Sequence, residues 1–156
     1  MKAGKIIAFL ILFACLGYFR EFFFVHLNGI MYKKYYGHTS LAVPGVMHLF
    51  ESLSYKTLYF SKYIYTLIWI AVFFFTNYFA IKTLSTQKIL LKFLTYSYVI
   101  LLSLAAIAMA YGLFINGRLQ DDEYTISRWL LGIAQSPLIC LILIASEKLY
   151  PKTTAS

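Results

Sequence analysis

Charged residues are scarce in this chain, at 13% of 156 residues. Cysteine is scarcer still, because only Cys15 and Cys140 are present and both fall inside long apolar runs. Two such cysteines form no disulfide framework, and they say nothing of the redox compartment. The composition is mostly apolar, since 61% of the residues are hydrophobic, 19% are aromatic and the mean hydropathy is +0.72. A soluble domain of this size could not bury so much apolar surface, and the composition therefore indicates a membrane protein.

The common signatures of catalysis and metal binding are also missing. The sequence contains no HExxH, GxSxG, phosphate-loop or Cys-x-x-Cys motif. Its histidines, His26, His38 and His48, are ten or more residues apart, which is poor spacing for metal ligands. The cysteines are expected near the middle of the bilayer and the histidines at one edge, which disfavours a Cys-His nucleophile pair. We therefore expect no catalytic residue, no metal and no cofactor.

The net charge of +8 is compatible with a protein that binds nucleic acid. Lysine and arginine lie at the edges of the apolar runs, however, and no polar domain presents them to phosphates. We therefore expect these charges to face the lipid bilayer and do not expect nucleic acid as a partner.

Four apolar runs reach the roughly 20 residues that a helix needs to cross a hydrocarbon core of ~30 Å. They are residues 6–25, 58–81, 89–115 and 126–149. Because the second and third runs are joined by a short turn, we expect their helices to be antiparallel neighbours. The sequence thus predicts an all-α, integral membrane four-helix transmembrane bundle that occupies residues 1–156 as a single polytopic domain.

The first run has a second interpretation as a cleaved signal. Lys2 and Lys5 precede an apolar stretch, and residues 12–15 loosely imitate a lipoprotein cleavage box. Residues 16–25 nevertheless continue the apolar run, where a mature lipoprotein would begin with a polar tether. We expect this segment to be retained as a helix.

Residues 26–57 are too polar to span a membrane and are expected to form an interfacial loop. Pro44 and Gly45 precede an apolar set at the i, i+3, i+4 and i+7 positions of a helix, while His48 and Glu51 fall on the other side. The apolar set is Val46, Leu49, Phe50 and Leu53. This pattern predicts a short amphipathic helix in the headgroup region, which serves as a lid, as a docking surface or as a simple connector. The flanking tyrosines fit an interfacial aromatic belt: Tyr32, Tyr35, Tyr36, Tyr55, Tyr59, Tyr63 and Tyr65.

Several polar residues interrupt the apolar runs. A charge at such depth costs several kcal/mol unless it pairs or reaches the interface. The alternating direction of the helices places these residues in one leaflet, and we predict an intramembrane polar cluster of Arg20, Glu21, Lys62, Arg128 and Gln135. Within it, Glu21 is expected to pair with Arg128. Pro137 lies inside the fourth run and is expected to kink that helix, because proline removes a backbone hydrogen bond.

Two explanations of this cluster remain open. The charges can neutralise one another and fix the order of the helices, while Gln135 bonds a carbonyl that Pro137 leaves free. Alternatively, the cluster marks a binding cavity or a contact with a polar segment of a partner.

Loop charge gives the expected orientation. The turn between the second and third runs contributes Lys82, Lys88 and Lys92, whereas the next turn contributes Arg118 and Arg128. By the positive-inside rule we expect both termini in the cytoplasm, with residues 26–57 outside.

Three segments carry a resemblance to a known family. The chain resembles the small exosortase F system-associated membrane proteins of Bacteroidetes in these segments. They are Arg20-Glu21-Phe-Phe-Phe-Val, residues 61–66 with Lys62-Tyr63, and Arg128-Trp129-Leu130 followed by Gln135-Ser136-Pro137. Members of that family carry an arginine in the first helix, an Arg-Tyr pair opening the second, and an arginine-rich start of the fourth that leads into Gln-Pro. This chain departs from the pattern by Lys62, by a single Arg128, by a longer spacing to Gln135 and by the inserted Ser136.

The resemblance implies a non-enzymatic accessory protein of the bacterial cytoplasmic (inner) membrane that works beside an exosortase-like membrane enzyme. The alternative is a small transporter or lipid-binding protein that uses the Arg20, Glu21, Arg128 and Gln135 cluster as its site. In either case we expect the lipid bilayer and another membrane protein or a ligand as partners, and the sequence does not specify an oligomeric state.

Overall fold

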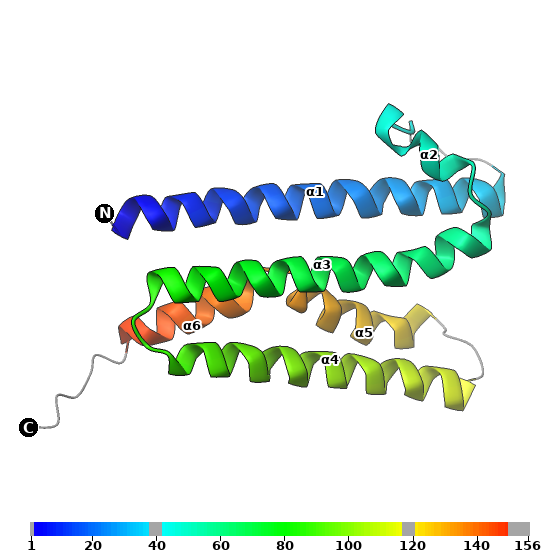
Figure 1. Ribbon diagram of the computed structural model, residues 1–156. Helices are drawn as coiled ribbons and strands as arrows, with labels where there is room; N and C mark the ends of the chain where they lie inside the picture. The colour runs from blue at the N-terminus through cyan, green and yellow to red at the C-terminus, as the bar shows by residue number, and fades with distance from the viewer. Residues whose placement is uncertain (1, 38–41, 117–120, 150–156) are drawn as a thin grey trace, which may run out of the picture. The chain divides into compact units, whose positions relative to one another are not determined.

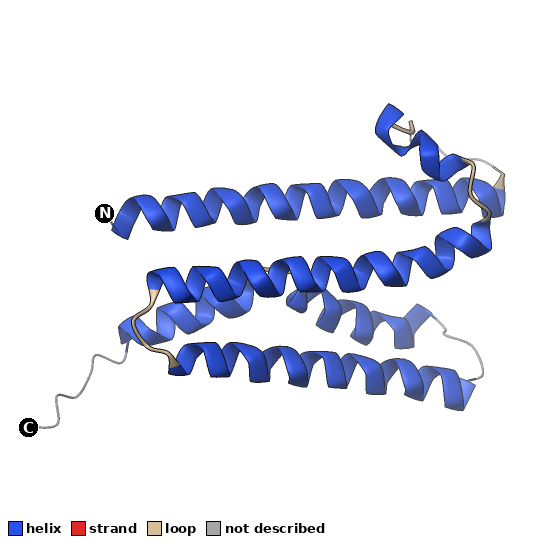
Figure 2. Ribbon diagram, viewed as in Figure 1, coloured by secondary structure: helices blue, strands red, loops and turns tan. Residues whose placement is uncertain are grey.

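The computed structural model describes residues 2–37, 42–116 and 121–149. Within these ranges the chain forms helices and loops and no strand (Figure 2). The elements run in the order α1 (Lys2–Tyr36), the 3-10 helix η1 (Gly45–Met47), α2 (His48–Glu51), α3 (Tyr55–Leu84), α4 (Ile89–Asn116), α5 (Asp121–Ala134) and α6 (Leu138–Leu149) (Figure 1). The prediction of an all-α chain is confirmed.

Three stretches are single helices long and apolar enough to cross a membrane: Ala3–Tyr36, Tyr55–Leu84 and Ile89–Tyr111. A fourth candidate consists of two pieces, Ile126–Ala134 and Leu138–Glu147, which are bent by 58° relative to each other. The described chain therefore has three candidate spans, or four if the bent pair forms one span. These candidate spans are those of a multi-pass membrane protein.

The chain forms two compact units, which are described separately. One unit comprises residues 11–69 and the other comprises residues 1–10 and 70–156. The first contains most of α1, the loop with η1 and α2, and the beginning of α3. The second contains the rest of α3 together with α4, α5 and α6.

Helix α1 is longer than the sequence predicted, because it continues past Val25 to Tyr36. The expectation of a loop over the whole of residues 26–57 is therefore wrong for residues 26–36. Polar side chains do not by themselves end a helix, whereas a residue with positive φ does. That residue is Gly37, with φ of 80°, whose amide donates a hydrogen bond to the carbonyl of Lys33 at 2.9 Å.

A short helical segment, η1 followed by α2, comes after Pro44, and its position in the headgroup region stays a prediction. Of the expected apolar set, Val46 and Leu49 are 77% and 80% exposed. Phe50 and Leu53 pack against the core that contains Met47.

Helix α3 begins with a side-chain cap. Ser54 precedes the helix, and its hydroxyl accepts a hydrogen bond from the amide of Thr57 at 3.2 Å. This is the standard way to satisfy an amide that has no partner within the first turn. At the other end, the hydroxyl of Ser85 accepts from the amide of Gln87 at 3.0 Å and thereby shapes the turn into α4.

In the unit that contains α4, the core forms where α4 packs against α5 and, less extensively, against α6. Leu94, Tyr98 and Ala105 of α4 are buried, as are Ala134, Ile139 and Cys140 of the bent pair. A small residue such as Ala105 lets a neighbouring helix approach closely, which is the usual basis of helix packing in membranes.

Candidate functional site

The break between α5 and α6 forms around Pro137, which has no amide hydrogen to give to the carbonyl of Ile133. Ser136 replaces that hydrogen bond, because its hydroxyl donates to the Ile133 carbonyl at 2.7 Å. The same hydroxyl accepts from the amide of Leu138, the first residue of α6, at 3.3 Å. A single serine side chain thus serves both ends of the interrupted helix.

Asn77 of α3 connects this break to α4. Its side-chain amide nitrogen donates to the hydroxyl of Tyr98 at 2.8 Å and to the carbonyl of Ser136 at 3.1 Å. Asn77 is fully buried, and its oxygen Oδ1 has no hydrogen-bond partner among the described residues. Burial of an amide costs free energy unless the amide is hydrogen-bonded, so loss of either hydrogen bond would be destabilising. Through these two hydrogen bonds Asn77 links α3 to α4 and to the break between α5 and α6. We call Asn77, Tyr98, Gln135, Ser136 and Pro137 the break cluster.

A second buried hydrogen bond holds α5 against α4. The hydroxyl of Ser127 donates to the carbonyl of Ala105 at 2.7 Å, and both residues are buried. Hydroxyl-to-carbonyl bonds of this kind are common between helices in membranes. Ser127 precedes Gln135 by eight residues, or about two helical turns, so polar side chains secure the bent pair at two levels.

The other unit contains a small folded assembly at the end of α1, which we call the cap. Its core consists of Leu27, Ile30 and Met31 of α1, Met47 of η1 and Leu58 of α3, all of them buried. The rings of Phe23, Phe50 and Tyr65 pack edge to face beside this core, with centroids 4.8 to 6.0 Å apart. Apolar burial and ring packing therefore fix the segment after Pro44 to α1 and α3.

Glu51 is the polar centre of the cap. Its Oε1 accepts from Nζ of Lys33 at 3.1 Å, and its Oε2 lies 2.8 Å from Nδ1 of His48. Its backbone carbonyl accepts from Nζ of Lys34 at 2.7 Å. The hydrogen bond with His48 and then that with Lys33 lower the pKa of Glu51, because both favour the charged carboxylate. The two lysines lie in the last turn of α1, where cations are favoured by the helix dipole.

A chain of tyrosine rings runs along one edge of the cap. Tyr35 of α1 lies 5.6 Å from Tyr55 of α3, and the series continues to Tyr59 and Tyr63 on α3. The hydroxyl of Tyr63 donates to that of Tyr59 at 2.9 Å. These are four of the seven tyrosines that the sequence predicted as an interfacial belt, whereas Tyr65 packs against Phe23 and Phe50.

Arg20 and Glu21 form an ion pair on α1, with Nη1 of Arg20 3.7 Å from Oε2 of Glu21. The guanidinium also lies over the ring of Phe24, 5.9 Å from its centroid. The side chain of Arg20 is 28% exposed and that of Glu21 is 69% exposed. The carboxylate is therefore the outer member of the pair.

The remaining predicted site residues are distributed over both units. Lys62 is half-buried in α3, and its carbonyl accepts from the hydroxyl of Thr66 at 2.8 Å. Arg128 is exposed on α5, whereas Gln135 is buried at the break. Since Arg20, Glu21 and Lys62 belong to one unit and Arg128 and Gln135 to the other, their assembly into a single cluster stays a prediction.

Sequence reasoning missed Asn77, Tyr98 and Lys33 as members of these sites. Asn77 is a single polar residue near one end of the second apolar run, and Tyr98 is one of many tyrosines. The available signal was the combination of an asparagine inside one apolar run and a Ser-Pro step in another. Lys33 and Lys34 were placed in a loop, although their position just before Gly37 fits the last turn of a helix.

Among the described residues, no group of three or more His, Cys, Asp or Glu side chains is close enough to hold a metal ion.

The fold and these sites define an all-helical protein with three or four candidate membrane spans, a cap fixed by Glu51 and a buried polar cluster at a broken helix. No family model matches the chain, and no curated protein or solved structure is significantly similar to it.

Proposed function

We propose that this protein is a non-enzymatic accessory protein of the bacterial inner membrane and that it binds another membrane protein through the Arg20-Glu21 face of α1. In this proposal the bent α5–α6 pair crosses the bilayer as one span. The chain then forms a four-helix transmembrane bundle with both termini in the cytoplasm, and η1 and α2 lie in the headgroup region outside.

The observation that carries the proposal is the exposure of Glu21 within an apolar helix. Its side chain is 69% exposed although it follows a long apolar run and lies only 3.7 Å from Arg20. An ionised carboxylate that faces lipid is costly, and ionisable residues in spans generally face protein or water. A basic or polar group on a partner helix would compensate that charge, in addition to the adjacent Arg20.

The resemblance to exosortase F system-associated proteins names the kind of partner. It implies an exosortase-like membrane enzyme that processes carboxy-terminal sorting signals, with this chain at its side. The segment on which the resemblance begins, Arg20-Glu21, is also the one that presents the exposed carboxylate.

A small transporter is the second candidate, and it is favoured by the break cluster. Broken helices with buried polar residues line the substrate sites of many transporters. Here Asn77 Oδ1 is buried and has no hydrogen-bond partner in the part of the chain that the structure describes, while the adjacent Asn77 nitrogen and Ser136 hydroxyl are already engaged. Replacement of Gln135 by Leu would abolish transport in this alternative and would leave partner binding by α1 unchanged.

The accessory role is tested by purification of tagged full-length chain from native membranes in mild detergent. Wild-type chain is expected to retain a partner in fixed stoichiometry, and Glu21→Gln is expected to lose it by roughly fivefold or more, given 1–2 kcal/mol for a polar contact in a bilayer. Glu147→Gln is the matched control, because it makes the same chemical change on α6. Equal retention of the partner by Glu21→Gln and Glu147→Gln would contradict the proposal.

A further inference from the structure

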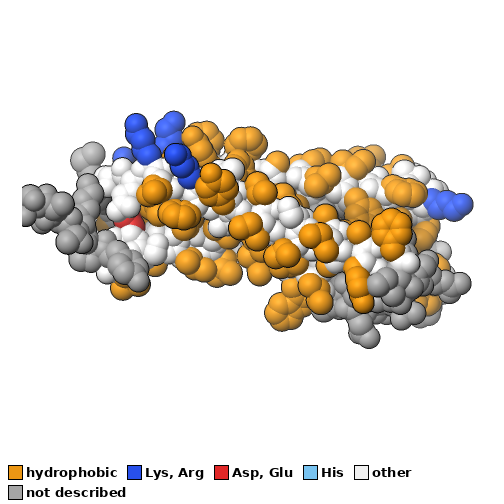
Figure 3. Space-filling model, turned by 90° about the horizontal axis from the view of Figure 1, so that it is seen from below, with side chains coloured by type: hydrophobic (Ala, Val, Ile, Leu, Met, Phe, Trp, Pro, Cys, Tyr) orange, Lys and Arg blue, Asp and Glu red, His pale blue; other side chains and the backbone are white. Residues whose placement is uncertain are grey.

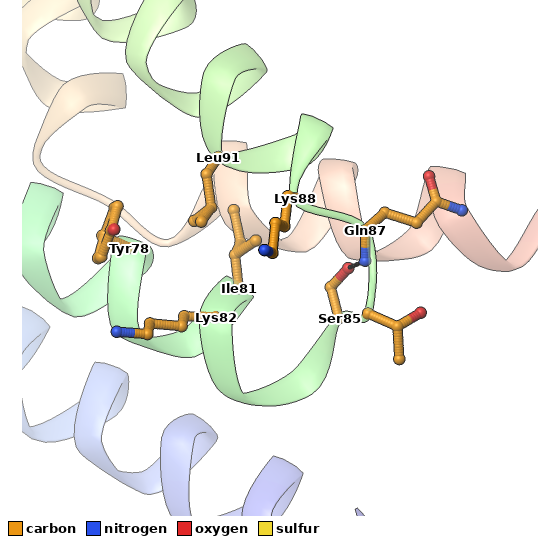
Figure 4. A pocket seen from close by; sticks show the side chains of 8 residues that line it. Tyr78, Ile81, Lys82, Ser85, Gln87, Lys88 and Leu91 are labelled. Atoms are coloured by element: carbon orange, nitrogen blue, oxygen red, sulfur yellow. Dashed lines mark hydrogen bonds between the residues drawn. The ribbon is translucent and has the colours of Figure 1, made fainter.

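A cavity of about 380 Å³ lies at the turn where α3 passes into α4. Its lining changes character along the helices. Tyr78, Ile81 and Leu91 form the part that lies further from the turn, and Lys82, Ser85 and Lys88 form the part at the turn itself. In Figure 4 the Lys82 side chain extends toward the Tyr78 ring, and the Lys88 side chain ends beside Ile81.

The cavity lies where two candidate spans end. The span Tyr55–Leu84 stops just before the turn, and Ile89–Tyr111 begins just after it. The turn must therefore sit at a surface of the membrane, and the neighbouring helical residues must enter the hydrocarbon. The polar part of the cavity thus faces the headgroup layer and its apolar part faces the acyl chains.

The charge at this position is strongly positive. Lys82 and Lys88 line the cavity and are exposed, and Lys92 lies one helical turn beyond Lys88. The one carboxylate described beside the turn is Glu147, which accepts from the amide and hydroxyl of Thr86 at 3.4 and 3.3 Å. In Figure 3 a group of Lys and Arg side chains lies at the end of the face where this turn lies, and hydrophobic side chains cover the middle.

We propose that this cavity binds one anionic phospholipid. The phosphate is bound by the ammonium groups of Lys82 and Lys88 at the turn, and the first part of an acyl chain lies against Tyr78, Ile81 and Leu91. Basic pockets between transmembrane helices are a known means of recognising anionic headgroups. The apolar half of the lining identifies the ligand as a lipid, because a free phosphate ion would make no use of it.

This inference is independent of the accessory role, since the cavity belongs to α3 and α4 and Glu21 belongs to α1. The lysines of the turn would then bind a lipid in addition to their effect on the orientation of the chain in the membrane. General attraction of lysines to an anionic surface would act on Lys92 as strongly as on Lys88, whereas a site distinguishes the lysine that lines it from the one that does not.

The test uses purified full-length chain in detergent and dioleoylphosphatidylglycerol as the probe, with native mass spectrometry to count bound lipids. One phosphatidylglycerol is expected to bind in preference to dioleoylphosphatidylcholine. Lys82→Gln and Lys88→Gln are each expected to weaken this binding roughly fivefold, the value that corresponds to about one lysine near an anionic surface. Lys92→Gln is the matched control, with the same loss of charge four residues from Lys88, and it is expected to bind as wild type.

Equal weakening by Lys82→Gln, Lys88→Gln and Lys92→Gln would overturn the site in favour of diffuse attraction. Glycerol phosphate provides the second arm, because it has the anionic group without acyl chains. If it displaces phosphatidylglycerol at equal concentration, the cavity is a phosphate site and the lipid assignment is wrong. Circular dichroism of each variant checks that the helices are intact, and Leu91→Ala tests the apolar half by the same lipid count.

Discussion

Asn77 of α3 donates a hydrogen bond to the carbonyl oxygen of Ser136, 3.1 Å away, at the point where α5 gives way to α6. The two residues are separated by 59 positions in the sequence, and both belong to the same compact unit. A side chain of one helix thus donates a hydrogen bond to a backbone carbonyl at the break in another helix. Backbone groups that lose their helical hydrogen bonds in a membrane are commonly satisfied in this way.

The first prediction concerns the coupling of Asn77 and Tyr98. Asn77→Ala and Tyr98→Phe each remove one side of a buried hydrogen bond of 2.8 Å and should lower the free energy of unfolding. In a double-mutant cycle, the coupling should be about 0.6 kcal/mol and at most ~1.7 kcal/mol, as for other polar contacts within bilayers. The measurement is reversible unfolding in mixed micelles. Ser103→Ala, on α4 as Tyr98 is, serves as the control. If the two losses in the free energy of unfolding simply add in the double mutant, the two side chains do not interact in the folded protein.

The second prediction concerns the 58° bend between α5 and α6. Pro137→Ala restores an amide that can donate to the Ile133 carbonyl, and the pair should straighten as a result. Spin labels at Ile126 and Leu149, which are both exposed, should move apart by roughly 4 Å at a rise of 1.5 Å per residue. The distance is measured by double electron-electron resonance in a chain without its native cysteines. Leu138→Ala provides the control, and an unchanged distance in Pro137→Ala would mean that packing, and not proline, sets the bend.

The long apolar helices that are candidate membrane spans were predictable, because apolar runs of sufficient length are a property of local sequence. The end of α1 was missed because polarity at His26 was taken as the end of a helix, whereas the chain continues to the αL residue Gly37. The contacts of Asn77 with Tyr98 and Ser136 were not predictable from spacing, since they join three segments that meet only in the fold.

The third prediction concerns the pH dependence of the cap. The pKa of Glu51 is lowered by His48 and Lys33, so its contribution to stability is present above the ordinary glutamate pKa of about 4.3 and is lost as the pH falls through the lowered value. Amide hydrogen exchange of residues 45–53, corrected for intrinsic rates, should therefore accelerate in that acidic window. Glu51→Gln should exchange faster than wild type at neutral pH and should lose the acid-dependent step. A step of the same size in Glu51→Gln would assign it to another group.

The fourth prediction concerns orientation in the membrane. Leu49 is 80% exposed in the cap, and Leu49→Cys should react with a membrane-impermeant maleimide in intact cells if the cap lies outside. Gln87→Cys, at the α3–α4 turn, should react only after permeabilisation. Gly37 is a poorer position for such a probe, because its φ of 80° disfavours any side chain. The reverse labelling pattern would invert the orientation.

The accessory role is tested most directly by photo-crosslinking from the Glu21 face of α1. Tyr18 precedes Glu21 by three residues, lies on the same face of the helix and is 68% exposed, while Leu67 of α3 is similarly exposed at 64%. With a benzophenone amino acid at either position in native membranes, we expect a single heteromeric adduct from position 18, little from position 67, and loss of the position 18 adduct in Glu21→Gln. Equal yields from both positions, or an adduct from position 18 that persists in Glu21→Gln, would contradict the binding of a partner by the Arg20-Glu21 face.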